Sequence, residues 1–158
     1  MARALAVFAA LLAFAVTFVG ASSAAEETTF KGSLEGTVTV TPINPPIASV
    51  LIEATGHATK LGRFTVEVPH VVNQALRVGS GSYIFTAANG DTLTASFTGV
   101  GTLVAPGVLS TTETATITGG TGRFTGATGS FTSNRTFFMA AGETVGSFEG
   151  TISSPGQG

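Results

Sequence analysis

The residues of this sequence that could carry out chemistry are few, and the most informative are an acid and a base, Glu113 and Arg135. The chain has two histidines, one aspartate and no cysteine. A Ser-His-Asp triad would need Asp91, which lies at a predicted hairpin tip where aspartate ordinarily forms the turn. Metal sites usually need three or four ligands, and neither His57 nor His70 lies in a zinc-binding spacing pattern. The sequence therefore predicts no triad, no metal site and no cofactor.

Glu113 and Arg135 meet if the segments around them pair as antiparallel strands. Pairing Ile117 with Phe131 places Glu113 directly opposite Arg135, on the apolar face of both segments. Burial of either charge alone is costly, so the two must pair or line a polar cavity. The pair is either a salt bridge that plugs one end of the fold or the charged wall of a pocket. In the pocket, Glu113 acts as a general acid or base and Arg135 orients a ligand oxygen.

Aromatic side chains share this inward face and would supply the apolar surface of such a pocket. The hydroxyl of the single tyrosine either joins the pocket or reaches solvent at its rim. The predicted ligand is a small hydrophobic molecule that is confined between these rings. The predicted ligand-binding residues are Tyr83, Phe85, Phe97, Phe131 and Phe137.

A glycine-dense segment, residues 118–129, connects the two strands that carry the charged pair. Glycine supplies the positive φ angles of tight turns, and Phe124 interrupts the polar run as an expected anchor. A phosphate-binding loop would need a lysine and a following helix. The segment has no lysine and is followed by a strand pattern, so it predicts a turn.

Alternation of apolar and polar residues at period two predicts eight strands with almost no helix. The prolines in residues 42–46 are expected to end the first strand, and Pro69 the third. A short helical turn is expected around residues 72–77. The strands are expected at about residues 30–40, 52–57, 63–68, 83–87, 93–97, 109–118, 129–139 and 144–153.

The fourth and fifth strands form a predicted hairpin around Asn89-Gly90-Asp91. An odd loop centred on Gly90 pairs Phe85 with Ala95, whereas a two-residue loop would mix the two faces. The odd loop is the better prediction.

The predicted fold is all-β, a single closed eight-stranded antiparallel barrel. A sandwich is the alternative, but residues 33–38 match residues 147–152 type for type. Matching strands at the two chain ends are candidates to pair and close the sheet. Glycines within strands, such as Gly32 and Gly150, favour the tight bends of a strongly coiled sheet.

Residues 1–25 have the charged start, apolar run and small residues of a secretory signal peptide, which leaves 26–158 as one domain. An uncleaved membrane anchor is the alternative, although the apolar run is short for a span. The mature chain carries six basic and nine acidic residues, a net charge of −3. This charge argues against nucleic acid and anionic membrane surfaces as partners. We expect a secreted or periplasmic protein with no membrane insertion after signal cleavage.

Residues 119–124 (Gly-Gly-Thr-Gly-Arg-Phe) and 126–131 (Gly-Ala-Thr-Gly-Ser-Phe) resemble the signature near the end of allene oxide cyclase-like and dirigent-like proteins. The resemblance implies an eight-stranded antiparallel barrel with an apolar cavity, often trimeric, that steers cyclisation or coupling of small hydrophobic molecules. The functional hypothesis is therefore a barrel that binds, and cyclises or isomerises, such a molecule. The alternative is a noncatalytic envelope or extracellular protein with a filled barrel.

Overall fold

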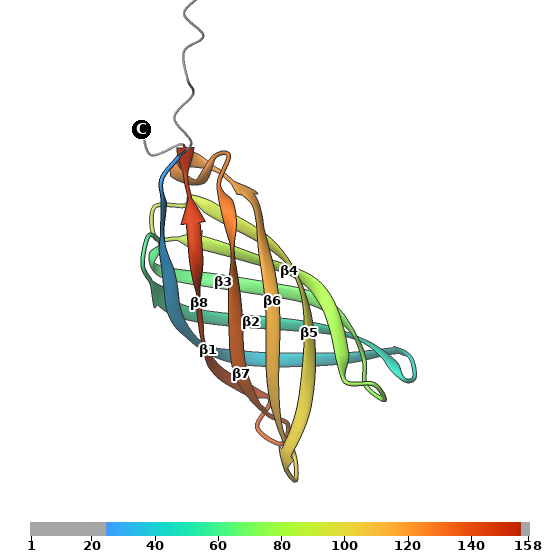
Figure 1. The fold of residues 1–158 in the computed structure, drawn as a ribbon. Helices are drawn as coiled ribbons and strands as arrows, with labels where there is room; N and C mark the ends of the chain where they lie inside the picture. Colours follow the sequence, from blue (N-terminus) through green and yellow to red (C-terminus); the bar gives the residue numbers. More distant parts are fainter. Residues whose placement is uncertain (1–24, 156–158) are drawn as a thin grey trace, which may run out of the picture.

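The protein is a closed barrel of eight antiparallel strands in which each strand pairs with its neighbours in sequence and β8 pairs with β1 (Figure 1). The computed structural model describes residues 25–155. All but the last residue of the predicted signal peptide lies outside this range. The predicted fold class, an all-β closed eight-stranded antiparallel barrel, is confirmed.

The strands are longer than the alternation alone indicates, because several continue into the hairpin ends. Between the first and last strands the only helical element is a single 3-10 turn, η1 (Gly122–Phe124), and no helix among residues 25–155 is long and apolar enough to cross a membrane. The strands are β1 (Glu27–Asn44), β2 (Ile47–Ala58), β3 (Gly62–Asn73), β4 (Val78–Ala87), β5 (Thr92–Ala105), β6 (Val108–Gly120), β7 (Thr128–Phe138) and β8 (Glu143–Ser153).

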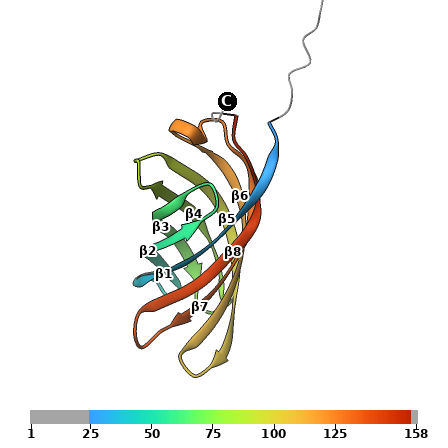
Figure 2. The ribbon, with the colours of Figure 1, turned by 90° about the vertical axis from the view of Figure 1, so that its left-hand side faces the viewer.

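The two chain ends close the barrel, as the matching segments predict. Strands β1 and β8 pair antiparallel from Glu27 opposite Ser153 to Thr37 opposite Glu143. Both described termini lie at the same end of the barrel, while the other end carries the β1–β2, β3–β4, β5–β6 and β7–β8 hairpins (Figures 1 and 2). Closure leaves no strand of the sheet with an unpaired edge.

Proline does not end the first and third strands where the sequence predicts. Strand β1 continues through Pro42 to Asn44, and β3 continues through Pro69 to Asn73. Pro69 keeps its place opposite Leu51 in β2, but the ladder to β4 is interrupted there, since proline has no N–H to donate.

The helical turn predicted at residues 72–77 is also wrong, because β3 extends to Asn73. The chain then reverses in a tight turn whose backbone is held by the side chain of Asn73. Its Oδ1 accepts hydrogen bonds from the N–H groups of Ala75 and Leu76, both at 3.1 Å.

The predicted strand faces are correct, but two predicted registers are wrong by two residues. The β4–β5 loop is odd, as predicted, yet it centres on Asn89, so Phe85 pairs with Leu93. In the β6–β7 hairpin, Ala115 rather than Ile117 pairs with Phe131. A shift of two residues keeps every side chain on its own face, so the alternation pattern does not distinguish the two registers.

The half of the barrel nearest the termini is filled by aromatic side chains. Phe30 contacts the rings of Phe85, Phe131 and Phe148 at centroid separations of 5.1–6.1 Å. Gly32 leaves room for this cluster, because a Cβ built there would lie 2.8 Å from Cζ of Phe148. Gly32 therefore makes space for rings inside a narrow barrel, in addition to allowing the sheet to coil.

Phe124 of η1 closes the end of the barrel that carries the termini. Its side chain is fully buried, which agrees with the predicted anchor role, and its backbone N–H donates to the carbonyl of Thr121 at 3.0 Å. The glycine-dense segment therefore forms a plug rather than a ligand loop.

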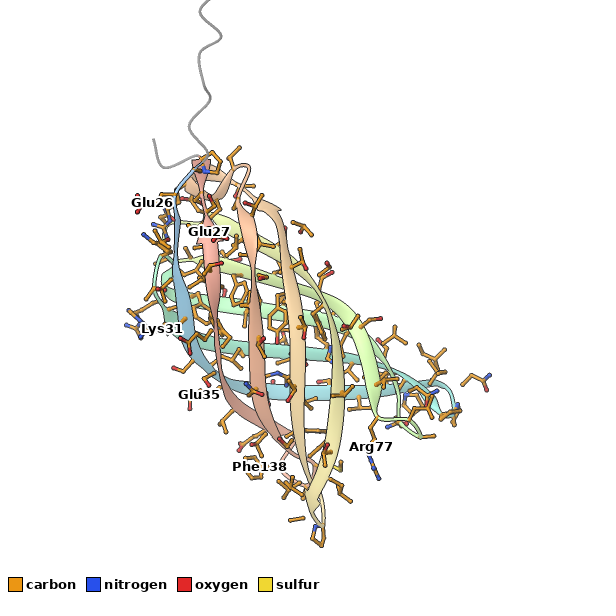
Figure 3. The ribbon with its side chains drawn as sticks, in the orientation of Figure 1. Glu26, Glu27, Lys31, Glu35, Arg77 and Phe138 are labelled. Carbon is orange, nitrogen blue, oxygen red and sulfur yellow. The ribbon has the colours of Figure 1, made fainter. Side chains whose placement is uncertain are left out.

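We expect Phe124→Ala to destabilise the domain by about 3–5 kcal/mol, because it leaves a cavity under the plug. Phe138→Ala is the matched control, since Phe138 is 40% exposed near the opposite end of the barrel (Figure 3), and it should change stability by less than about 0.5 kcal/mol. Chemical denaturation of residues 26–158 measures both. Equal effects of the two substitutions would show that Phe124 does not plug the barrel.

Candidate functional site

The half of the barrel farthest from the termini contains a cavity of about 180 Å³ that opens towards the hairpin ends. Residues of β1 to β7 line it, and most of the lining is apolar. Figure 3 shows Arg77, one of the lining residues, at this end, and Glu26 and Glu27 at the other. The apolar part of the wall includes Val38, Val50, Ile52, Val72 and Leu109.

Glu113 and Arg135 form a buried ion pair in the wall of this cavity. The predicted register had them directly opposite each other, but Glu113 pairs with Ser133 and Arg135 with Thr111. The two side chains meet diagonally across the strand pair, which long side chains can do. Nη2 of Arg135 donates to Oε1 of Glu113, and Nε donates to Oε2 at 3.4 Å. Both residues are at most 5% exposed.

Arg135 also bonds to β8, through the hydroxyl of Thr144. Nη1 of Arg135 donates to Oγ1 of Thr144 at 3.2 Å, and that hydroxyl donates to the carbonyl of Thr136 at 2.9 Å. Together with the two bonds to Glu113, the bond to Thr144 uses three of the five guanidinium N–H groups. Because Arg135 lines the cavity, the remaining N–H groups are available to an oxygen atom of a ligand.

The hydroxyl of Tyr83 joins the charged pair rather than reaching solvent. It donates to Oε2 of Glu113, and the side chain is fully buried. The ring stacks on Phe85 at a centroid separation of 5.5 Å and an interplanar angle of 10°. Tyr83 therefore joins the aromatic cluster to the polar wall of the cavity.

Burial and charge keep the two partners of Glu113 in their protonated forms. Burial, reinforced by the negative charge of Glu113, raises the pKa of Tyr83 well above its usual range. Burial, the largest single effect, would lower the pKa of Arg135, but the charge of Glu113 together with hydrogen bonding and the contribution of Tyr83 outweighs it, and the pKa of Arg135 is raised. A hydroxyl donor and a guanidinium thus converge on one carboxylate.

The predicted site residues divide between the cavity and the aromatic cluster. Glu113, Arg135, Phe97 and Phe137 line the cavity. Tyr83, Phe85 and Phe131 lie behind this wall in the aromatic cluster, where Tyr83 packs within 5.3 Å of the Phe131 ring. The structure thus brings the charged pair and two of the predicted aromatic residues to one cavity.

His70 lines the same cavity from β3 and was not among the predicted site residues. Alternation along the strand places His70 on the same face as the inward residues Val66 and Val68. The strand, however, was expected to end at Pro69. Its ring lies 5.5 Å from the ring of Phe97, in an edge-on arrangement. Continuing the alternation past the proline would have found it.

The single aspartate has a structural role at a hairpin tip. Asp91 shapes the hairpin tip, as predicted: its N–H bonds to Oδ1 of Asn89, and its carboxylate accepts from the N–H of Arg123 at 3.3 Å. Within residues 25–155, no group of three or more histidine or acidic side chains is placed to hold a metal ion.

Comparison with solved structures shows that the chain has the dirigent-type barrel fold. The structure of the pterocarpan synthase dirigent protein GePTS1 superposes with a TM-score of 0.58 and 13% identity, covering 91% of this chain and 97% of that one. That of the pterocarpan synthase dirigent protein PsPTS1 gives 0.58 and 10%, covering 83% and 97%. No protein-family model and no curated protein matches the sequence. The resemblance in the sequence is thus confirmed for the fold.

We expect Glu113→Gln to destabilise the protein by about 3–5 kcal/mol, because Arg135 is then buried without a counter-charge. A triple variant, Tyr83→Phe with Glu113→Leu and Arg135→Met, removes both charges and the tyrosine hydroxyl, leaves Thr144 bonded to the carbonyl of Thr136, and should be at least as stable as the wild type. Urea denaturation measures both variants. Glu35→Gln, at an exposed position, is the control and should have little effect. A wild-type midpoint for Glu113→Gln would contradict the buried pair.

Proposed function

We propose that the protein binds a small hydrophobic ring compound in the cavity and catalyses its cyclisation or isomerisation without a cofactor. The observation that carries the proposal is an apolar cavity whose wall contains a buried guanidinium with unused N–H groups. Enclosed apolar pockets with a few converging polar groups are typical of binding sites for small molecules.

The size of the cavity limits what it can enclose. Its volume of about 180 Å³ is below the roughly 300–1,000 Å³ of pockets for drug-sized ligands. An apolar protein cavity of about 150 Å³ is known to bind benzene. The cavity therefore suits one ring with a small substituent, or one end of a longer molecule whose remainder extends through the mouth.

Around the mouth, the hairpins present exposed apolar side chains. They include Ile43, Leu76, Val104 and Met139, which are 44–71% exposed. Such a rim offers an apolar ligand a surface to contact before it enters. This arrangement supports an apolar ligand over a charged one.

Arg135 gives the cavity a chemical function beyond binding. Its free N–H groups can hold a ligand oxygen and stabilise negative charge that develops on it. Glu113 has donors on both oxygens, so its role in the proposal is to hold the guanidinium in place. Confinement brings the reacting ends of a flexible ligand together, which lowers the entropic part of the barrier.

The solved structures of the same fold are consistent with this proposal, since both carry the name pterocarpan synthase. We propose in addition that the chain acts in the periplasm or outside the cell after removal of residues 1–25. The competing hypothesis is a noncatalytic protein with a filled barrel. The aromatic cluster that fills the other half of the barrel favours it.

Native mass spectrometry of the exported protein distinguishes the two hypotheses. We expect a copurified small molecule, or binding of members of a lipid and terpenoid panel. The same spectrum counts the subunits, and three is the number that the resemblance in the sequence implies. A wild-type protein that carries no ligand and binds nothing in the panel would support the filled barrel.

We expect Val72→Phe to abolish ligand binding without unfolding the protein, because the larger side chain fills the cavity that Val72 lines. Val71→Phe is the matched control, since Val71 is the neighbouring residue on β3, is 48% exposed and points outward. Ligand-observed NMR with phenol and anisole as probes measures binding to both variants. Equal binding by both variants would place the ligand outside the cavity.

A further inference from the structure

His70 is the histidine of the cavity wall, and the ion pair does not use it. It is half-buried on β3, lines the same space as Arg135, and packs edge-on against Phe97. Its backbone is held from both sides, because it pairs with Val50 of β2 and with Gly81 of β4, which approaches it closely.

A backbone carbonyl determines which nitrogen of His70 carries the proton. Nδ1 lies 2.8 Å from the carbonyl oxygen of Val68. A carbonyl only accepts hydrogen bonds, so Nδ1 must be the donor. In the neutral ring, Nε2 then has a free lone pair.

The Nε2 atom has no protein partner in the described part of the chain and is not fully buried, on a residue that lines the cavity. Among residues 25–155, no protein group forms a hydrogen bond with it, and it is not among the buried side-chain atoms without a partner. A lone pair in this position can accept a hydrogen bond or a proton from a ligand.

Burial favours the neutral form of His70. Burial lowers its pKa below the usual 6.5, and the positive charge of Arg135 on β7 acts in the same direction. The bond to Val68 and the negative charge of Glu113 on β6 oppose this shift and are outweighed. Arg77, in the turn after β3, adds a further positive charge to the cavity wall.

We infer that His70 is a catalytic residue of the cavity, the general base that takes a proton from a small ring compound carrying a proton donor. The inference rests on the proposed function and adds a proton acceptor to the cavity beside Glu113, which already accepts three hydrogen bonds from Tyr83 and Arg135. Nε2 removes a proton from an O–H group of the ligand, and the resulting oxyanion accepts hydrogen bonds from Arg135. After ring closure or a double-bond shift, the imidazolium returns the proton to the product. The reaction is an isomerisation and needs no oxidant or reductant.

Phenol and anisole test the inference, because they share a ring but only phenol has a proton to donate. NMR titration of the wild type gives the ratio of their affinities. In His70→Asn, which retains a donor for the Val68 carbonyl and lacks Nε2, this ratio should fall by about two- to tenfold. His57→Asn, at an exposed position on β2, is the matched control and should leave the ratio unchanged.

The ratio should also depend on pH in the wild type. It should be constant at neutral pH, where His70 is neutral, and fall as the pH drops below 6.5 through the lowered pKa of His70, since the imidazolium cannot accept. His70→Asn should remove this dependence. In ¹⁵N-histidine spectra of the wild type, phenol should shift the Nε2 resonance and anisole should not, a readout that needs no variant.

The outcomes separate the two proposals. Binding of both probes, with the same ratio in wild type and His70→Asn and no phenol-specific shift at Nε2, would overturn the role of His70 and leave the cavity proposal standing. If neither probe binds and no ligand in the panel binds, both proposals are overturned.

Discussion

Closure of the sheet determines how much interior the protein has to fill. An eight-stranded barrel is just wide enough for side chains from its walls to meet in the middle. Near the termini, rings such as Phe30 and Phe148 meet there and leave no space for a ligand. At the hairpin end, the inward positions carry smaller residues such as Val38, Val72 and Gly99, and the same cross-section leaves a cavity. The choice of side chain along each strand thus divides one barrel into a solid half and a hollow half.

The polar cluster of Tyr83, Glu113, Arg135 and Thr144 lies at the boundary between these halves. Residues of more than one strand hold it in place. Tyr83 reaches Glu113 from the solid side, and Thr144 supports Arg135 from β8. Gly99 has no side chain and so leaves room for Glu113, because a Cβ there would lie 2.7 Å from Cγ of Glu113. A buried ion pair stabilises little by itself, since desolvation offsets most of the attraction. In the proposed function, the pair holds the guanidinium in place beside the cavity.

The fold and the faces of the strands were predictable because alternation has a period of two and an inward charge must find a partner. Glu113 and Arg135 were therefore expected together before their register was known. The register itself was not predictable, since a shift of two residues, as between Ile117 and Ala115 opposite Phe131, leaves the pattern unchanged. His70 was missed for a different reason: a proline was expected to end its strand, whereas Pro69 loses only the bond to one neighbour. The cavity depends on side-chain volumes summed over seven strands, which no single segment reveals.

The interrupted ladder at Pro69 also has a consequence for how the barrel moves. Residues 68 and 69 of β3 do not belong to the ladder with β4, although pairing resumes on both sides, at Glu67 and at His70. Backbone amides that lack ladder bonds are among the first to exchange with solvent when a protein opens locally. The seam between β3 and β4 is thus weakened one residue away from His70. Because the closed barrel has no free edge at which opening could begin, we expect this seam, in the strand that carries His70, to be one of the places where the barrel opens locally.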